Sequence, residues 1–130
     1  MNGKWQFEEF IAGPVTKTGD RIHVTLSSTG IFYLNSKAIK VLDEPDAVVL
    51  FYDKRLQTIA MKRAPTTKRN AYLLKPKDGQ RSESGRTVYA ANFCRHYHIR
   101  PKRTVAFLNP SVDDGHLILN MHDTAPVAKK

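Results

Sequence analysis

The sequence has a single cysteine and no long hydrophobic run. One cysteine excludes an internal disulfide framework and is typical of a reducing compartment, so we expect a cytoplasmic protein. No apolar stretch approaches the roughly 18 residues that a membrane span needs, and the N-terminus lacks the charged and then apolar pattern of a signal peptide. The cysteine, Cys94, falls in a helical pattern beside Phe93 and Tyr97, which predicts a small buried side chain rather than a reactive thiol.

Motifs of the common enzyme classes are absent as well. Gly3-Lys4 stands without the rest of a phosphate-binding glycine loop, and there is no Gly-x-Ser-x-Gly elbow. Two adjacent aspartates, Asp113 and Asp114, precede a glycine in the stretch 110–115, a pattern that favours a hairpin turn over a catalytic carboxylate pair. The sequence therefore predicts a protein that is not an enzyme.

The histidines do not form a metal-binding pattern. His96 and His98 are two residues apart in a helical pattern, where such residues do not share a face. Pairs of cysteines and the His-Glu-x-x-His arrangement are both missing. We therefore expect neither a bound metal nor a cofactor.

Acidic residues are scarce relative to basic ones. Lysine and arginine total 21 against 12 for aspartate and glutamate, which gives a formal net charge of +9. Such an excess favours polyanionic partners, because each lysine or arginine near a phosphate releases condensed counterions. A basic surface that serves solubility alone is the alternative.

Hydrophobic periodicity predicts one mainly β domain, residues 1–130, with two short helices. We expect the first helix to begin at Asn35 or Ser36 and the second to be capped by Asn92. The first helix should end before Pro45. The expected strands lie at 21–26, 31–34, 47–53, 58–63, 71–75, 86–90, 104–109 and 116–121.

The two ends of the chain fall outside this pattern. Residues 1–20 carry Trp5, Phe7 and Phe10, so this segment either docks on the domain or is flexible. The tail, residues 123–130, is expected to fray.

The order strand, strand, helix, strand, strand occurs twice, in residues 21–63 and 71–122. A unit of this size is too small to enclose its own core, whereas two copies can bury each other's apolar faces. A shift of 55 residues aligns Gly30 with Gly85, Ala38 with Phe93 and Leu42 with Tyr97. A slip of one residue then aligns Pro45 with Pro101 and Phe51 with Phe107.

Each copy resembles the AbrB/SpoVT swapped-hairpin module, whose pattern is Gly-Arg, two strand residues, Ile-Pro, a basic short helix ending in Leu-Gly-Ile, and a hairpin. In the second copy the resemblance rests on Gly85, Arg86, Val88, Arg95 and Ile99. In the first it rests on Gly30, Tyr33, Leu34, Lys40 and Leu42. The Ile-Pro step is replaced by Leu34-Asn35 and Tyr89-Ala90, and the Leu-Gly step by Leu42-Asp43 and Tyr97-His98.

This resemblance implies a pseudo-dimeric swapped-hairpin barrel, similar to the double-psi β-barrels, that could be complete as a monomer or form a homodimer. It also implies DNA binding, in a transcriptional regulator or in an antitoxin with a toxin as protein partner. Arg86, Arg95 and Lys40 match its basic positions, and other cations cluster at expected turns, where they can reach phosphates. The candidate DNA-binding residues are Arg86, Arg95, Lys40, Lys54, Arg55, Arg63, Arg100, Lys102 and Arg103.

A protein-interaction module on a fold that has lost DNA binding is the alternative function. Exposure of Trp5, Phe7 and Phe10 would favour it, and their burial against the domain would weaken it.

Overall fold

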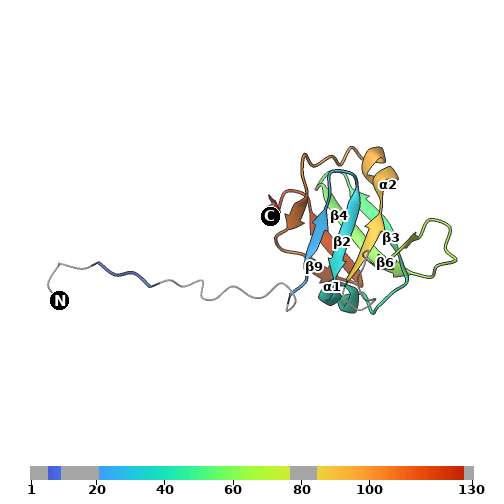
Figure 1. The fold of residues 1–130 in the computed structure, drawn as a ribbon, viewed down its shortest axis with the longest axis horizontal. Helices are drawn as coiled ribbons and strands as arrows, with labels where there is room; N and C mark the ends of the chain where they lie inside the picture. The colour runs from blue at the N-terminus through green and yellow to red at the C-terminus, as the bar shows by residue number, and fades with distance from the viewer. Residues whose placement is uncertain (1–5, 10–20, 77–84, 128–130) are drawn as a thin grey trace.

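The computed structural model describes residues 6–9, 21–76 and 85–127 (Figure 1). Within these ranges the chain is mainly β with two short helices, as the sequence predicts. The helices are α1 (Ser36–Val41) and α2 (Ala91–His96). The strands are β1 (Val24–Leu26), β2 (Ile31–Asn35), β3 (Ala47–Asp53), β4 (Thr58–Ala64), β5 (Tyr72–Leu73), β6 (Lys75–Pro76), β7 (Gly85–Tyr89), β8 (Val105–Phe107), β9 (Ser111–Asp113), β10 (His116–Asn120) and β11 (Thr124–Pro126).

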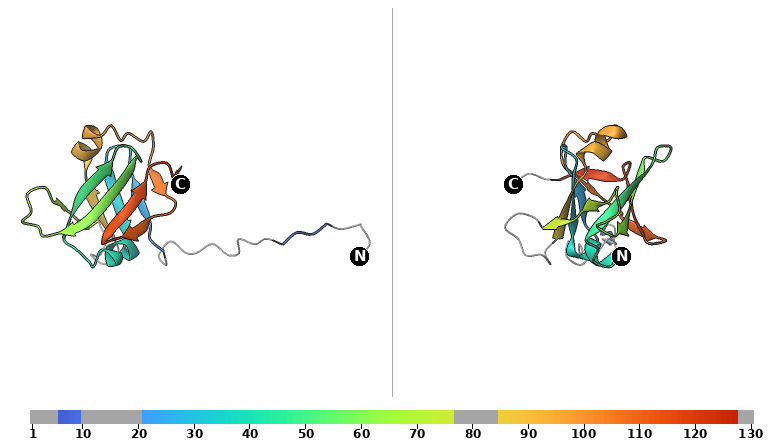
Figure 2. Two further views of the ribbon diagram at one scale, coloured as in Figure 1. Left: turned by 180° about the vertical axis from the view of Figure 1, so that it is seen from behind. Right: turned by 90° about the vertical axis from the view of Figure 1, so that its right-hand side faces the viewer.

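The strands form two antiparallel sheets. One has the order β11-β8-β1-β2-β7-β6 and the other β5-β3-β4-β10-β9. Figure 2 shows the sheets facing each other, with the blue β1, the cyan β2 and the yellow β7 opposite the green β3 and β4. Among the described strands no pairing joins the two sheets edge to edge, so their hydrogen bonds do not close a barrel.

The core fills the space between the sheets. Alternation along β2 buries Phe32 and Leu34, and alternation along β10 buries Leu117 and Leu119, because successive side chains of a strand point to opposite faces. The largest side chains that are fully buried are Phe32, Leu26, Leu34, Ile59, Met61, Leu117, Leu119, Val24, Val48 and Val88.

The two helices lie at opposite ends of the molecule (Figure 1). The antiparallel pairing of β2 with β7 explains this arrangement, since it sets Ile31 opposite Tyr89 and Asn35 opposite Gly85. Each helix follows directly on one of these strands, and the two strands end at opposite ends of the sheet. The two copies predicted from the sequence therefore meet at a pair of antiparallel strands with one helix at each end.

The helices repeat each other in detail at the 55-residue shift. Ala38 and Ile39 are the buried residues of α1, and their counterparts Phe93 and Cys94 are those of α2. The hydrogen bond from Glu44 N to Ile39 O, 2.9 Å, has its counterpart between Ile99 N and Cys94 O, 2.8 Å. The correspondence therefore continues through the end of each helix.

The correspondence ends in the strands that follow the helices. Strand β3 leaves the sheet of β2 and joins that of β4 and β10, whereas β8 stays in the sheet of β7 and pairs there with β1 and β11. Phe51 is accordingly 46% exposed while Phe107 is 3% exposed, so the two phenylalanines aligned in the sequence occupy different environments.

The predicted N-terminal cap of α1 is confirmed, and the predicted cap of α2, Asn92, is wrong. Asn35 caps α1, its Oδ1 accepting from Ala38 N at 2.9 Å. The N-cap of α2 is Ala90 and no side chain caps it, because Asn92 lies inside the first turn. The Asn92 Oδ1 there accepts a hydrogen bond from the Tyr72 hydroxyl at 2.8 Å.

The single strand predicted at 71–75 is two short strands in different sheets. Tyr72–Leu73 pairs with β3, and Lys75–Pro76 pairs with β7. The buried Leu74 lies between them, its N–H bonded to Asp46 O at 3.0 Å. The chain crosses from one sheet to the other at this residue.

The prediction of a frayed tail is wrong for residues 124–126. They form β11, which pairs with β8, and Val127 N donates to Thr104 O at 2.9 Å. The outer edge of β8 would otherwise present unpaired backbone groups, and the tail satisfies them. Residues 128–130 lie outside the described residues.

The turn predicted at 110–115 is also shorter than expected. Ser111–Asp113 forms strand β9, and only Asp114 and Gly115 make the turn. Both have positive φ, 51° and 75°, as a two-residue type I′ hairpin requires. The backbone geometry of the turn thus explains Asp114 and Gly115, while Asp113 belongs to β9.

Candidate nucleic-acid interface

Three segments meet at the end of the molecule that carries α2, and together they form what we term the α2-end surface. They are the β1–β2 turn (27–30), the β3–β4 turn (54–57), and α2 with the loop after it (91–104) (Figure 2). A hollow of about 260 Å³ lies between the first and third segments, lined by Thr29, Gly30, Arg95 and Arg100 among others.

The α2-end surface is basic, and the exposed Asp53 lies directly before its β3–β4 turn in the chain. Aspartate and glutamate do not occur in any of its three segments. Among the residues that the structure describes, none of its lysines and arginines forms an ion pair. Its six cations, all exposed, are Lys54, Arg55, Arg95, Arg100, Lys102 and Arg103.

The local structure of this end explains why the cations face solvent. The loop after α2 turns away at His98, whose φ is 58°, and buried Ile99 anchors it to the core. Arg100 follows this anchor and is exposed. In the β3–β4 turn the Asp53 Oδ1 accepts from Leu56 N at 3.0 Å, which fixes the turn that presents Lys54.

The inner side of α2 carries the cysteine and an aromatic cluster. Cys94 is buried as predicted, and burial raises the pKa of its thiol to about 11. The rings of Tyr52, Phe93 and Tyr97 contact one another, with centroids 4.9 Å apart for the two tyrosines. His96 lies edge-on to Tyr97 at 4.6 Å.

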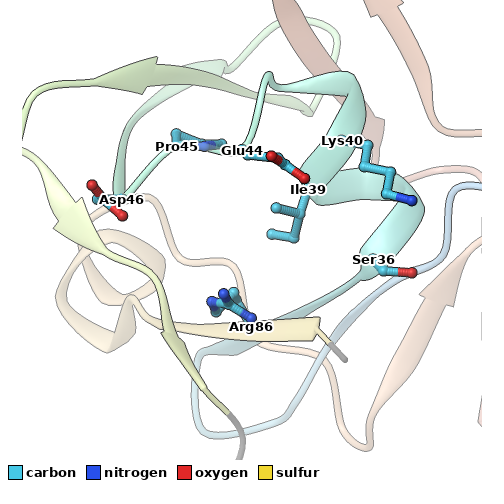
Figure 3. Close-up of a pocket in the computed structure, with 7 residues that line it drawn as sticks. All are labelled: Ser36, Ile39, Lys40, Glu44, Pro45, Asp46 and Arg86. Carbon is cyan, nitrogen blue, oxygen red and sulfur yellow. The ribbon is translucent and has the colours of Figure 1, made fainter. Parts of the chain in front are cut away.

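The remaining three candidates lie at the opposite end, beside α1. Arg86, Lys40 and two carboxylates, Glu44 and Asp46, line a hollow of about 440 Å³ (Figure 3). In Figure 3 the half-buried Arg86 faces this hollow from the side opposite Glu44, and its Nη1 donates to Gly85 O at 2.9 Å. The hollow beside α1 therefore carries both positive and negative side chains.

Arg63 belongs to the same mixed region. It is exposed on β4 and lines a neighbouring hollow that also includes Glu44 and Asp46. The structure thus separates the nine candidates into six at the α2 end and three at the α1 end. Lys40 and Arg95, which the 55-residue shift aligns, are on opposite ends and do not form one surface.

In the described part of the chain, no group of three or more His, Cys, Asp or Glu side chains is placed to hold a metal ion. Within the same residues no helix is long and apolar enough to cross a membrane.

Comparisons with protein-family models, with curated proteins and with solved structures find no match for this chain. The function must therefore be inferred from the α2-end surface.

The contact between Tyr52 and Tyr97 on this surface was not predicted from the sequence. Tyr52 and Tyr97 are 45 positions apart in the chain, and each is typical of a core residue in its own element. Only the packing of α2 against β3 brings the two rings together beside Arg100. No local pattern signals such a contact.

Proposed function

We propose that this protein is a non-enzymatic DNA-binding protein that holds the phosphate backbone with its α2-end surface. The observation that carries the proposal is the convergence of six exposed lysines and arginines, from two segments that are distant in sequence and contain no acidic residue. Lysine and arginine side chains at such positions contact phosphates and fix the orientation of a protein on DNA.

The AbrB-like character of the protein is part of this proposal. The family pattern has a glycine after the helix, and the chain has Asp43 and His98 at those positions. Both residues adopt the left-handed backbone that glycine favours, with φ of 66° and 58°. This supports a fold derived from two swapped-hairpin modules, related to the double-psi barrels; with that fold we propose a role as transcriptional regulator or antitoxin.

The contact surface differs from that expected from the resemblance. Arg86 and Lys40 match basic positions of the family, but they share their hollow with Glu44 and Asp46. A carboxylate beside a cation weakens its attraction for phosphate. We therefore assign the main contact to the α2 end and expect a smaller contribution from the α1 end.

Two triple variants with the same change in charge test this assignment. One removes Arg100, Lys102 and Arg103 by substitution with alanine. The matched control removes three cations from the α1 end: Lys40, Arg63 and Arg86. Fluorescence anisotropy with a mixed-sequence blunt duplex, titrated between about 50 and 200 mM salt, measures the affinity and its salt dependence.

The α2-end variant should bind more weakly, and its salt slope should be lower by about one for each phosphate that it no longer neutralises. The α1-end variant should retain most of the affinity. Equal reductions in the two variants would show that net charge alone matters, and the absence of binding by the unaltered protein at 50 mM salt would refute DNA binding.

A protein-interaction module is the second candidate, favoured by Phe7. This side chain is 83% exposed, although Trp5 and Phe10 lie outside the described residues. An exposed phenylalanine suits an apolar partner surface such as a toxin. Binding to such a partner would change little between 50 and 200 mM salt, unlike binding to DNA.

A further inference from the structure

A hollow lined by two tyrosines opens within the α2-end surface, between the β3–β4 turn and the loop after α2. Its volume is about 330 Å³, and we call it the tyrosine hollow. The apolar part of its lining is Tyr52, Tyr97, Ile99, Pro101 and Met121. Gln57, His98 and Arg100 supply polar groups around it.

The tyrosine rings are held in place by their neighbours. Their centroids are 4.9 Å apart with the planes inclined at 43°. Phe93, which is buried, contacts Tyr97 edge-on at 5.2 Å and Tyr52 at 6.3 Å. Both tyrosines are nonetheless only partly buried, so the cluster combines rigidity with access from solvent.

The residues around the tyrosine hollow favour an aromatic ligand that carries negative charge. Arg100 lines both the tyrosine hollow and the hollow beside Arg95, so a phosphate held there would be adjacent to the rings. Burial and the nearby Asp53 raise the pKa of Tyr52, so its hydroxyl is neutral near pH 7, as that of any ordinary tyrosine is. Aromatic rings next to phosphate-binding cations are the arrangement by which proteins hold unpaired bases.

We propose that the tyrosine hollow receives an unpaired base of the bound DNA, so that the preferred ligand is a duplex with a single-stranded overhang. This inference rests on the proposed function of the α2-end surface. Bases within a blunt duplex are stacked and cannot enter the hollow without the cost of extrusion. An overhang presents them at no such cost, and stacking on an aromatic side chain strengthens binding.

The experiment compares three ligands for the full-length protein by fluorescence anisotropy at one salt concentration. They are a blunt duplex, the same duplex with an overhang of six thymidines, and the same overhang with abasic sites in place of its bases. The abasic overhang retains the phosphates and lacks only the rings. We expect the thymidine overhang to bind about tenfold more tightly than the abasic one.

Two variants connect this preference to the hollow. Tyr97→Leu should remove most of the preference for thymidine over abasic overhangs while binding of the blunt duplex changes little. Tyr89→Leu is the control, because Tyr89 is 57% exposed and does not line the hollow. It should leave the preference intact.

The outcomes separate this inference from the proposed function. Equal binding of the thymidine and abasic overhangs by the unaltered protein would overturn the base pocket and leave DNA binding standing. A preference that persists in a folded Tyr97→Leu protein would also overturn it. No binding of any of the three ligands would refute the proposed function itself. If Tyr97→Leu does not fold, the comparison of thymidine and abasic overhangs with the unaltered protein still tests the base pocket.

Discussion

Asp43 and His98 are 55 residues apart and have the same left-handed backbone conformation, with φ of 66° and 58°. Each follows the C-cap residue of its helix, where a glycine is the usual residue because it has no Cβ to clash. Both helix ends keep their hydrogen bonds, from Asp43 N to Lys40 O and from His98 N to Arg95 O. The two helix ends therefore share a backbone geometry that glycine favours, although neither has a glycine there.

Asp43→Gly should therefore stabilise the protein. Removing the Cβ relieves the left-handed conformation, and the free energy of unfolding should rise by about 1 kcal/mol. Urea unfolding followed by circular dichroism measures the change. Lys40→Gly is the matched control, since Lys40 is exposed within α1 and a glycine there should cost about 1 kcal/mol. Destabilisation by Asp43→Gly would contradict the account of this helix end.

The parts of the fold that depend on local sequence were predictable. The apolar run at 47–53 indicated the bounds of β3, and Asn35 marked the start of α1 because its short side chain can bond the helix N–H groups. Both features depend only on residues that are close together in the sequence.

The parts that depend on distant pairing were not predictable. Nothing within residues 104–109 indicates that β8 joins the sheet of β1, or that the tail covers its free edge. The same holds for the candidate site. The basic residues are visible in the sequence, but their division between two ends follows from the pairing of β2 with β7.

Asn35→Ala should be among the more damaging single substitutions. Its side chain is 5% exposed; Oδ1 accepts from His23 N at 3.1 Å and from Ala38 N, and Nδ2 donates to Arg21 O at 2.8 Å. Alanine leaves these backbone groups without their partner, at a cost of about 2–3 kcal/mol. The shift of the urea unfolding midpoint measures this loss of stability.

Asn92→Ala provides the matched comparison in α2. Asn92 is exposed and does not cap its helix, so its loss should cost less than about 1 kcal/mol. Similar losses of stability for the two asparagine variants would show that the Asn35 network contributes little.

Acid should destabilise the protein through His23. Burial, and then the charge of Arg21, lower the pKa of this imidazole in the folded state. The unfolded chain therefore binds a proton more readily, and the stability contributed by neutral His23 is fully present above about pH 6.5. It is lost as the pH falls from there towards the folded pKa.

His23→Gln should reduce the dependence of the urea midpoint on pH between about 7 and 5. Arg21→Ala should reduce it in part, because the burial of the imidazole remains. An unchanged pH dependence in His23→Gln would exclude His23 as a source of acid sensitivity.

Cys94 should resist modification in the folded protein. The pKa of about 11 leaves little thiolate at pH 8, and the side chain is 4% exposed. Reaction with a disulfide reagent should therefore be slow in buffer and fast in urea, where the thiol is accessible. Fast reaction of the native protein at pH 8 would contradict the buried position.

Gly30→Ala should disrupt the α2-end surface itself. The φ of Gly30 is +89°, and a Cβ there would lie 2.7 Å from Ala91 Cα, at the point where the β1–β2 turn meets α2. The added methyl group must push the helix away or strain the turn, so a loss of more than about 3 kcal/mol is expected. Affinity for DNA should fall as well, because Arg95 and Arg100 move with α2.

Gly115→Ala separates the two causes of this loss. Its φ is also positive, +75°, but a Cβ at this position meets nothing within 4 Å. It should therefore cost only the left-handed conformation, about 1–2 kcal/mol, and leave DNA binding unchanged. If the two alanine variants lose the same stability, the close approach of Gly30 to Ala91 is not what requires a glycine, and backbone conformation alone explains both positions.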